Sequence, residues 1–99
     1  MLRTPIAEEV HIQLRGDYGI GRVRELVRTL APAIMSHNAT LDLANATFSH
    51  SSAFGVLVAT RLRMLKERGL STMRLAGIND DIRRLLNISN TGGLFSLNV

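Results

Sequence analysis

Residues 39–64, ATLDLANATFSHSSAFGVLVATRLRM, indicate the fold of this chain more clearly than any other stretch. The apolar run 39–43 is short enough to be a central strand that is covered on both faces. A turn rich in serine follows, and a helix should begin near Ser51 or Ser52 and end at Gly69. A strand that brings small hydroxyl side chains to a helix N-terminus builds a place where a phosphate, on a ligand or on the serine itself, is electrostatically favoured. The pattern therefore indicates a switch rather than a catalyst.

The residues before this stretch predict a strand, a helix and a turn. Apolar and polar residues alternate over 10–14, as in a strand with one buried face, and the glycine-containing segment 16–19 should end it. From Ile20 the apolar residues recur every three or four positions, which is typical of an amphipathic helix. Pro32 should kink or end that helix, and the polar residues 36–38 should form a turn.

The residues after the opening stretch continue the alternation of strand and helix. Residues 70–76 are a third candidate for a buried strand, and 94–99 can form a last strand. Between them, Asn79 and the two aspartates that follow it predict the start of a helix that runs through Ile88. Such alternation favours a mainly parallel sheet.

A further strand is expected at the N-terminal edge of the sheet. Residues 2–7 are long enough for it, and a turn at Glu8 and Glu9 would pair it antiparallel to its neighbour. Pro5 confines such a strand to an edge, because proline lacks the N–H that a central strand donates. The expected fold class is therefore a small α/β domain with about three helices and a central, mostly parallel sheet of four to five strands, whose N-terminal edge strand is antiparallel.

Composition indicates one domain and excludes several chemistries. With 45% hydrophobic and only 4% aromatic residues, residues 1–99 should form a single domain with an aliphatic core. The absence of cysteine excludes disulfides, thiolate metal sites and a thiol nucleophile. The longest apolar run, 53–59, is far shorter than the roughly 20 residues of a membrane span. Pro5, Glu8 and Glu9 interrupt the region of a signal peptide, so we expect a cytoplasmic protein.

The charge balance leaves several classes of partner open. Twelve basic residues, eleven of them arginine, stand against eight acidic ones, and the net charge is +4. An acidic protein surface, a phosphate group or a nucleic acid would suit this charge. Most of the arginines are spread along three predicted helices, however, and an amphipathic helix needs such a solvated face in any case. The shortage of aromatic residues for stacking on bases argues against a nucleic acid.

A pattern of residues surrounds the start of the second predicted helix: an Asp-Leu strand end, a Phe, two serines, a Gly and an aliphatic run. These residues are Asp42, Leu43, Phe48, Ser51, Ser52, Gly55, Val56, Leu57 and Val58. Gly16 and Asp17 form a Gly-acid pair after an earlier strand, and an Arg-rich helix at 83–86 precedes a Gly-Leu-Phe segment at 93–95. In this order, the pattern resembles the STAS domain family, which is named for sulfate transporters and anti-sigma factor antagonists. The resemblance covers nearly the whole chain.

The resemblance implies a regulatory role. In the antagonists of the family, a partner that is both an anti-sigma factor and a kinase phosphorylates the first serine of the motif, and this changes binding. By position that serine is Ser51, with Ser52 as second choice. The resemblance therefore implies an anti-sigma factor antagonist whose partner is an anti-sigma factor with serine kinase activity. Its expected partner surface comprises Gly16, Asp17, Ser49, His50, Ser51, Ser52, Ala53 and Phe54.

Two residues depart from the family motif: His50 stands where the family has Asp, and Ala53 where it has Gly. Both favour a second interpretation, an unphosphorylated adaptor in a larger sensory or lipid-transport assembly. A third makes the basic surface a nucleic-acid or nucleotide site. Phe54 would anchor a partner if its ring pointed outward and belong to the core if it pointed inward. Gly55 inside a helix predicts close packing on the sheet, or otherwise close approach by a partner.

No catalytic, metal-binding or cofactor-binding residues are expected. His50 lies next to Ser51, yet no acid that would orient its imidazole is identifiable. His11 and His37 lack the short spacing of metal ligands. In the simplest interpretation, an unmodified Ser51 or Ser52 only caps the helix.

Overall fold

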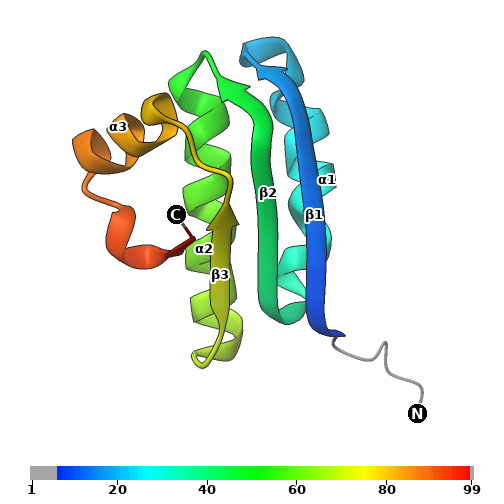
Figure 1. Cartoon of the computed structure of the whole chain (residues 1–99). Coiled ribbons are helices and arrows are strands. Elements are labelled where there is room, and N and C mark those ends of the chain that lie inside the picture. Colours follow the sequence, from blue (N-terminus) through cyan, green and yellow to red (C-terminus); the bar gives the residue numbers. More distant parts are fainter. Residues whose placement is uncertain (1–6, 99) are drawn as a thin grey trace.

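Four parallel strands form the sheet at the centre of the structure, a computed structural model that describes residues 7–98. The strands are β1 (Ala7–Tyr18), β2 (Ser36–Phe48), β3 (Thr72–Ala76) and β4 (Ser96–Asn98). Each strand pairs in parallel with the next one along the chain, so the order across the sheet is β1, β2, β3, β4 (Figure 1). The predicted α/β fold with a mainly parallel sheet is therefore confirmed.

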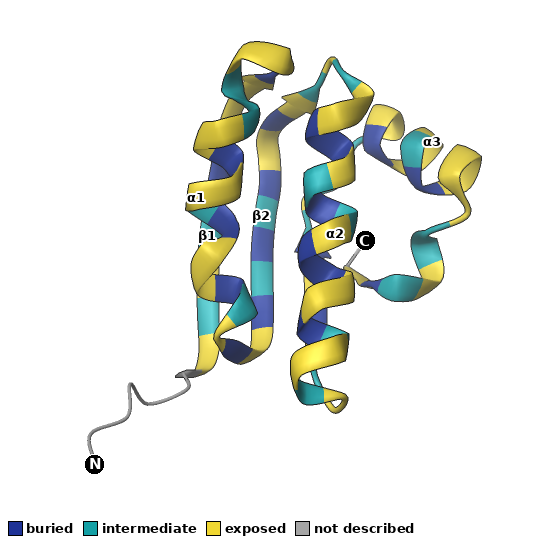
Figure 2. Ribbon diagram, turned by 180° about the vertical axis from the view of Figure 1, so that it is seen from behind, coloured by how far each residue is buried: buried dark blue, intermediate teal, exposed yellow. Residues whose placement is uncertain are grey.

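Of the three α-helices within residues 7–98, two cover the same face of this sheet. Helix α1 (Val23–Ile34) connects β1 to β2, and α2 (Ser51–Arg68) connects β2 to β3. Both lie behind the strands in Figure 1 and in front of them in Figure 2, which gives the reverse view. Helix α3 (Asp80–Ser89) lies beside the sheet and contacts β2. Short 3-10 helices, η1 (Ile20–Arg22) and η2 (Gly92–Leu94), precede α1 and β4.

The core lies between the sheet and the two covering helices. Alternate residues of β2, namely Ala39, Leu41 and Leu43, are at most 1% exposed. Between them, Thr40 and Asp42 point to the other face of the sheet and are half-buried. The central position of β2 is confirmed, but the prediction that both of its faces are covered is wrong, because α1 and α2 lie on the same side and Thr40 and Asp42 on the other face are only half-buried.

The predicted N-terminal edge strand lies almost entirely outside the described residues. Of the segment 2–7, only Ala7 is described, and β1 begins there. The turn predicted at Glu8 and Glu9 is wrong, because both residues lie within β1, where Glu9 pairs with Asn38 of β2. All strand pairs within residues 7–98 are parallel.

Strands β1 and β2 are both longer than the sequence predicts. β1 does not end at Gly16 but continues through it, with φ 84°, to Tyr18. β2 already begins at Ser36, so the turn predicted over 36–38 is wrong. The buried hydroxyl of Ser36 donates a hydrogen bond to the carbonyl of Ala33 at 2.8 Å. Polar residues are tolerated in both extensions because the neighbouring strand pairs with their backbone.

The helix boundaries agree with the sequence at most ends. Helix α1 continues two residues past Pro32, which lies in its last turn. Helix α2 begins at the predicted serines and ends directly before Gly69, as expected. The cap of α3 is also confirmed, because the side-chain oxygen of Asn79 accepts a hydrogen bond from the backbone N–H of Ile82 at 2.9 Å.

The packing of α2 differs from the expectation at Gly55. Gly55 is exposed, and a Cβ added there would meet no atom within 4 Å, so the prediction that it packs closely on the sheet is wrong. Leu62 is also exposed. The residues of α2 that are buried are Ala53, Phe54, Leu57, Thr60, Arg61 and Met64.

A buried arginine joins α2 to the C-terminal part of the sheet. Arg61 is 7% exposed, and its Nε donates a hydrogen bond to the carbonyl of Leu94 at 2.7 Å. Its Nη1 and Nη2 donate to the hydroxyl and the carbonyl of Ser71, each at 2.9 Å. Desolvation lowers the pKa of the guanidinium, which still stays charged at neutral pH. Arg61 thus holds the segments that lead into β3 and β4.

Candidate functional site

Helix α2 begins with a histidine cap. His50 precedes the first helical residue in an extended conformation, with φ −136° and ψ 138°. Its Nδ1 accepts a hydrogen bond from the backbone N–H of Ser52 at 3.1 Å, which satisfies one of the free N–H groups at the helix N-terminus. The interpretation in which Ser51 or Ser52 caps the helix is wrong, because His50 supplies the cap and both serine side chains are exposed.

The next two residues of α2 point inward. Ala53 is 0% exposed and Phe54 is 6% exposed. The edge of the Phe54 ring meets Phe48 with 6.1 Å between ring centroids, and Phe48 stacks on Tyr18 at 5.8 Å. These contacts tie the ends of β1 and β2 to the first turn of α2. Phe54 and Ala53 are therefore core residues, and the outward orientation in which Phe54 would anchor a partner does not occur.

Asp17 joins the end of β1 to the end of β2. Its Oδ1 accepts a hydrogen bond from the hydroxyl of Thr47 at 2.7 Å, and its Oδ2 accepts one from the hydroxyl of Ser49 at 2.8 Å. The hydrogen bonds from Thr47 and Ser49 lower the pKa of the Asp17 carboxyl, and they outweigh the opposing effect of desolvation. An ionised Asp17 therefore fixes the end of β1 against the end of β2.

Arg22 also supports the end of β1. Its Nη1 donates hydrogen bonds to the carbonyls of Arg15 at 3.0 Å and Asp17 at 3.3 Å. The guanidinium lies 4.1 Å from the centroid of the Tyr18 ring, which is a favourable cation–π distance. A Cβ at Gly16 would lie only 2.8 Å from Arg22 Nη1. Because Gly16 has no side chain, the guanidinium of Arg22 can lie against its backbone.

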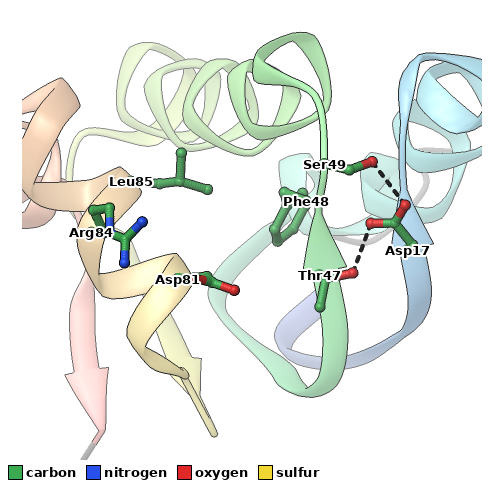
Figure 3. A pocket seen from close by; sticks show the side chains of 7 residues that line it. All are labelled: Asp17, Thr47, Phe48, Ser49, Asp81, Arg84 and Leu85. Atoms are coloured by element: carbon green, nitrogen blue, oxygen red, sulfur yellow. Dashed lines mark hydrogen bonds between the residues drawn. The ribbon is translucent and has the colours of Figure 1, made fainter.

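A cleft of about 280 Å³ opens between the end of β2 and α3. In Figure 3, Thr47 and Ser49 reach from the end of β2 toward Asp17, and Asp81 and Arg84 approach the cleft from α3. Neither Asp81 nor Arg84 has an ion pair within residues 7–98. The complete lining is Asp17, Thr47, Phe48, Ser49, Asp81, Arg84 and Leu85. The cleft therefore offers hydroxyl groups and charges of both signs to a partner.

Sequence reasoning found one wall of this cleft and missed the other. It named Asp17 and Ser49, which the structure brings into contact. It used Asp81 only as a signal for the start of a helix, and it did not place Arg84 in a site. The carboxyl ends of adjacent parallel strands meet at one edge of the sheet. Since α3 begins shortly after β3 ends, this rule would have placed Asp81 and Arg84 near the end of β2.

Within residues 7–98, no group of three or more histidine, aspartate and glutamate side chains lies in a position to hold a metal ion. None of the described helices combines the length and the apolar character needed to cross a membrane.

Comparisons with known proteins identify relatives of this fold. No protein-family profile matches the chain. A STAS-domain containing protein of Pseudomonas aeruginosa (strain UCBPP-PA14) is 31% identical over 91 residues, which cover 91% of this chain and 88% of that protein.

Two solved structures share the fold at lower sequence identity. The Bacillus cell fate determinant SpoIIAA in its phosphorylated form matches with a TM-score of 0.68 and 19% identity, over 100% of this chain and 90% of that one. The anti-sigma factor antagonist SpoIIAA in its unphosphorylated form matches with a TM-score of 0.67 and 17% identity, over 100% and 84%. The fold agrees with these structures, the sequence agrees with the Pseudomonas relative over most of both chains, and this chain therefore belongs to the STAS-domain family.

Proposed function

We propose that this domain is an anti-sigma factor antagonist, which binds an anti-sigma factor with serine kinase activity and is switched by phosphorylation of Ser51. The observation that carries the proposal is the exposed position of Ser51 as the first residue of α2. SpoIIAA, whose fold this chain shares, is an anti-sigma factor antagonist that also has a phosphorylated form. On this proposal the protein regulates transcription through its partner.

The surroundings of Ser51 suit a phosphate. The N-terminus of an 18-residue helix carries a partial positive charge, and the first turn of α2 contains no acidic residue that would repel an anion. A phosphate adds roughly −1.5 to −2 charges at neutral pH. The negative charge is therefore tolerated by the fold, while it changes the surface that a partner meets.

Phosphorylation at Ser51 would act on the partner rather than on the fold. The His50 cap and the buried Phe54 ring do not involve the Ser51 hydroxyl, so both can persist after modification. The adjacent exposed residues Ser49 and Ser52 would then border a group of much greater charge and bulk. A partner that fits the unmodified surface closely would lose affinity for the modified one.

Phosphopeptide mass spectrometry on protein isolated from its native cells tests the proposal. We expect part of the protein to carry phosphate on Ser51. Ser51→Ala should abolish the modification, whereas Ser52→Ala, a matched change at the next exposed residue, should leave it in place. If Ser51 is unmodified under every growth condition, the switch does not operate.

A second candidate function is an unphosphorylated adaptor in a larger sensory or lipid-transport assembly. The favouring observation is His50, whose imidazole caps α2 at a position where the family has a carboxylate. A kinase that recognises its substrate through this carboxylate would lack that contact here. Pull-down experiments with the wild type and with Ser51→Asp separate the two functions, since an adaptor should keep its partners in both and an antagonist should lose its anti-sigma factor in the variant.

A further inference from the structure

A groove lies between α1 and α2. These two helices cover one side of the sheet (Figure 2). The groove has a volume of about 180 Å³ and adjoins a hollow of about 300 Å³ on α1, with Val27 in the lining of both. We refer to the two together as the α1–α2 groove. Its residues are Val27, Ile34, Val56, Ala59, Thr60 and Arg63, together with Arg24 and Arg28.

The valine at the middle of this groove has no role in the core. Val27 is 51% exposed, although Leu26 and Leu30 on the same helix are 0% exposed. Valine is also a weaker helix former than alanine, because its branched Cβ restricts χ1 in a helix. Neither packing nor helix propensity explains an exposed valine at this position. A partner side chain that covers it would.

Basic side chains border the aliphatic floor of the groove. Arg24 and Arg28 are exposed, and neither forms an ion pair within the described part of the chain. Arg63 on α2 lies 3.6 Å from Glu67, measured from Nε to Oε1. Glu25, the nearby acid on α1, is engaged in an ion pair of its own. The rim of the α1–α2 groove is therefore net positive.

We propose that the α1–α2 groove binds an acidic amphipathic helix of a partner protein. Aliphatic side chains spaced three and four residues apart on such a helix would cover Val27 and Val56. Its aspartates and glutamates would pair with Arg24 and Arg28. The groove contains neither Ser51 nor any residue of the cleft at Asp17, so this binding does not depend on the phosphorylation switch.

The shape of the groove favours a helix over other acidic partners. A membrane surface takes up apolar side chains that protrude from a protein, whereas the apolar floor here is recessed between two helices. A single-stranded nucleic acid stacks its bases on aromatic side chains, and the α1–α2 groove contains none. A row of aliphatic side chains on one helix matches the apolar lining of the groove.

The test uses the whole chain and two synthetic helical peptides of about 15 residues, each with leucines spaced three and four apart. One peptide carries Asp and Glu at its remaining polar positions, and the matched peptide carries Lys there. Fluorescence anisotropy should detect binding of the acidic peptide only. Combined Arg24→Glu and Arg28→Glu should weaken it about tenfold or more, and Val27→Ser by about fivefold. Arg83→Glu, an exposed arginine on α3, is the control and should bind like the wild type.

Three outcomes would overturn the proposal. The acidic peptide binds no better than the lysine peptide, or it binds the double variant as tightly as the wild type. In the third, anionic lipid vesicles or a DNA duplex bind through Arg24 and Arg28 while the acidic peptide does not bind.

Methyl NMR spectra provide a separate check of where the peptide binds. The shift changes should fall on Val27 and Val56, and changes confined to other residues would count against the groove. Phosphorylation of Ser51 is measured separately, so the two proposals can fail independently.

Discussion

His50 keeps the cap of α2 by a different chemistry from the aspartate of the family motif. The lone pair of its Nδ1 accepts the Ser52 N–H as a carboxylate oxygen would. A neutral imidazole, however, brings no fixed negative charge to the position beside Ser51. The substitution therefore preserves the local structure of the motif while it changes the electrostatic surroundings of the proposed phosphorylation site.

Removal of this cap should cost measurable stability. His50→Ala should lower the free energy of unfolding by about 1 kcal/mol, because a backbone N–H at the start of α2 loses its acceptor. His50→Asp should stay within about 0.5 kcal/mol of the wild type, since aspartate is a preferred cap. Urea unfolding measures both. Ser51→Ala is the control at an exposed neighbour, and an equal loss in this variant would argue against the cap.

Asp17 makes stability depend on pH in the acid range. Since the hydrogen bonds from Thr47 and Ser49 lower the pKa of Asp17 in the folded state, the unfolded chain binds this proton more readily. The contribution to stability is present above the unfolded-state pKa of about 4, and it is lost as pH falls through the lower folded-state pKa. In Asp17→Asn this part of the pH dependence should be absent from urea midpoints measured between about pH 2 and 6.

The cause of the lowered pKa can be tested with the two donors. Thr47→Val and Ser49→Ala each remove one hydrogen bond to the Asp17 carboxylate. The pKa of Asp17, followed by NMR titration, should rise toward its ordinary value in both variants. An unchanged pKa in both would mean that these hydroxyl groups do not set it.

At the scale of the elements, periodicity predicts the helices and the middle of each strand, but not the strand ends. The ends of β1 and β2 are polar, and neighbouring backbone stabilises them, which no local pattern reveals. The register between these strands also shifts between Gln13 and Arg15, and such an irregularity depends on the pairing of distant residues. The helices were easier to predict because caps and apolar stripes are local signals.

The junction between β3 and α3 passes so close to β2 that it requires a glycine. Gly77 has φ 69°, and a Cβ there would lie 2.9 Å from the Cβ of Ala44. Gly77→Ala should therefore lower the free energy of unfolding by about 1–3 kcal/mol in urea titrations. Gly93→Ala is the matched control, because no atom lies within 4 Å of its Cβ position, and it should change stability by less than about 0.5 kcal/mol. Similar losses in both variants would contradict this account.

At the scale of the whole molecule, Arg61 connects parts of the chain that are far apart in sequence. Its three hydrogen bonds join α2 to Ser71 before β3 and to Leu94 before β4. Arg61→Ala should lower the free energy of unfolding by about 2 kcal/mol or more, because the carbonyls of two half-buried residues, Ser71 and Leu94, lose a charged donor. Arg63→Ala, an exposed arginine on the same helix, should change it by less than about 0.5 kcal/mol. Thermal and urea unfolding measure both, and a loss in Arg61→Ala no larger than in Arg63→Ala would show that the link contributes little.

The candidate site was partly predictable for reasons that lie in the fold. The motif around Ser51 is continuous in sequence, so its place at the start of α2 could be predicted. The second wall of the cleft, with Asp81 and Arg84, comes from a helix about thirty residues later in the chain. Its position next to β2 depends on the order of the strands in the sheet. The sequence also could not predict which way the Phe54 side chain points, since a phenylalanine suits a core and an interface equally.

The order of strands across the sheet is the order in which a ribosome makes them. Each new strand adds to the edge formed by the strand before it, and no described strand has to be inserted between two earlier ones. The unit β1, α1 and β2 can therefore close while later residues are still in the exit tunnel, and β3 and β4 can extend it as they emerge. We expect the nascent chain to fold vectorially, with Arg61 completing its contacts to Leu94 last of all.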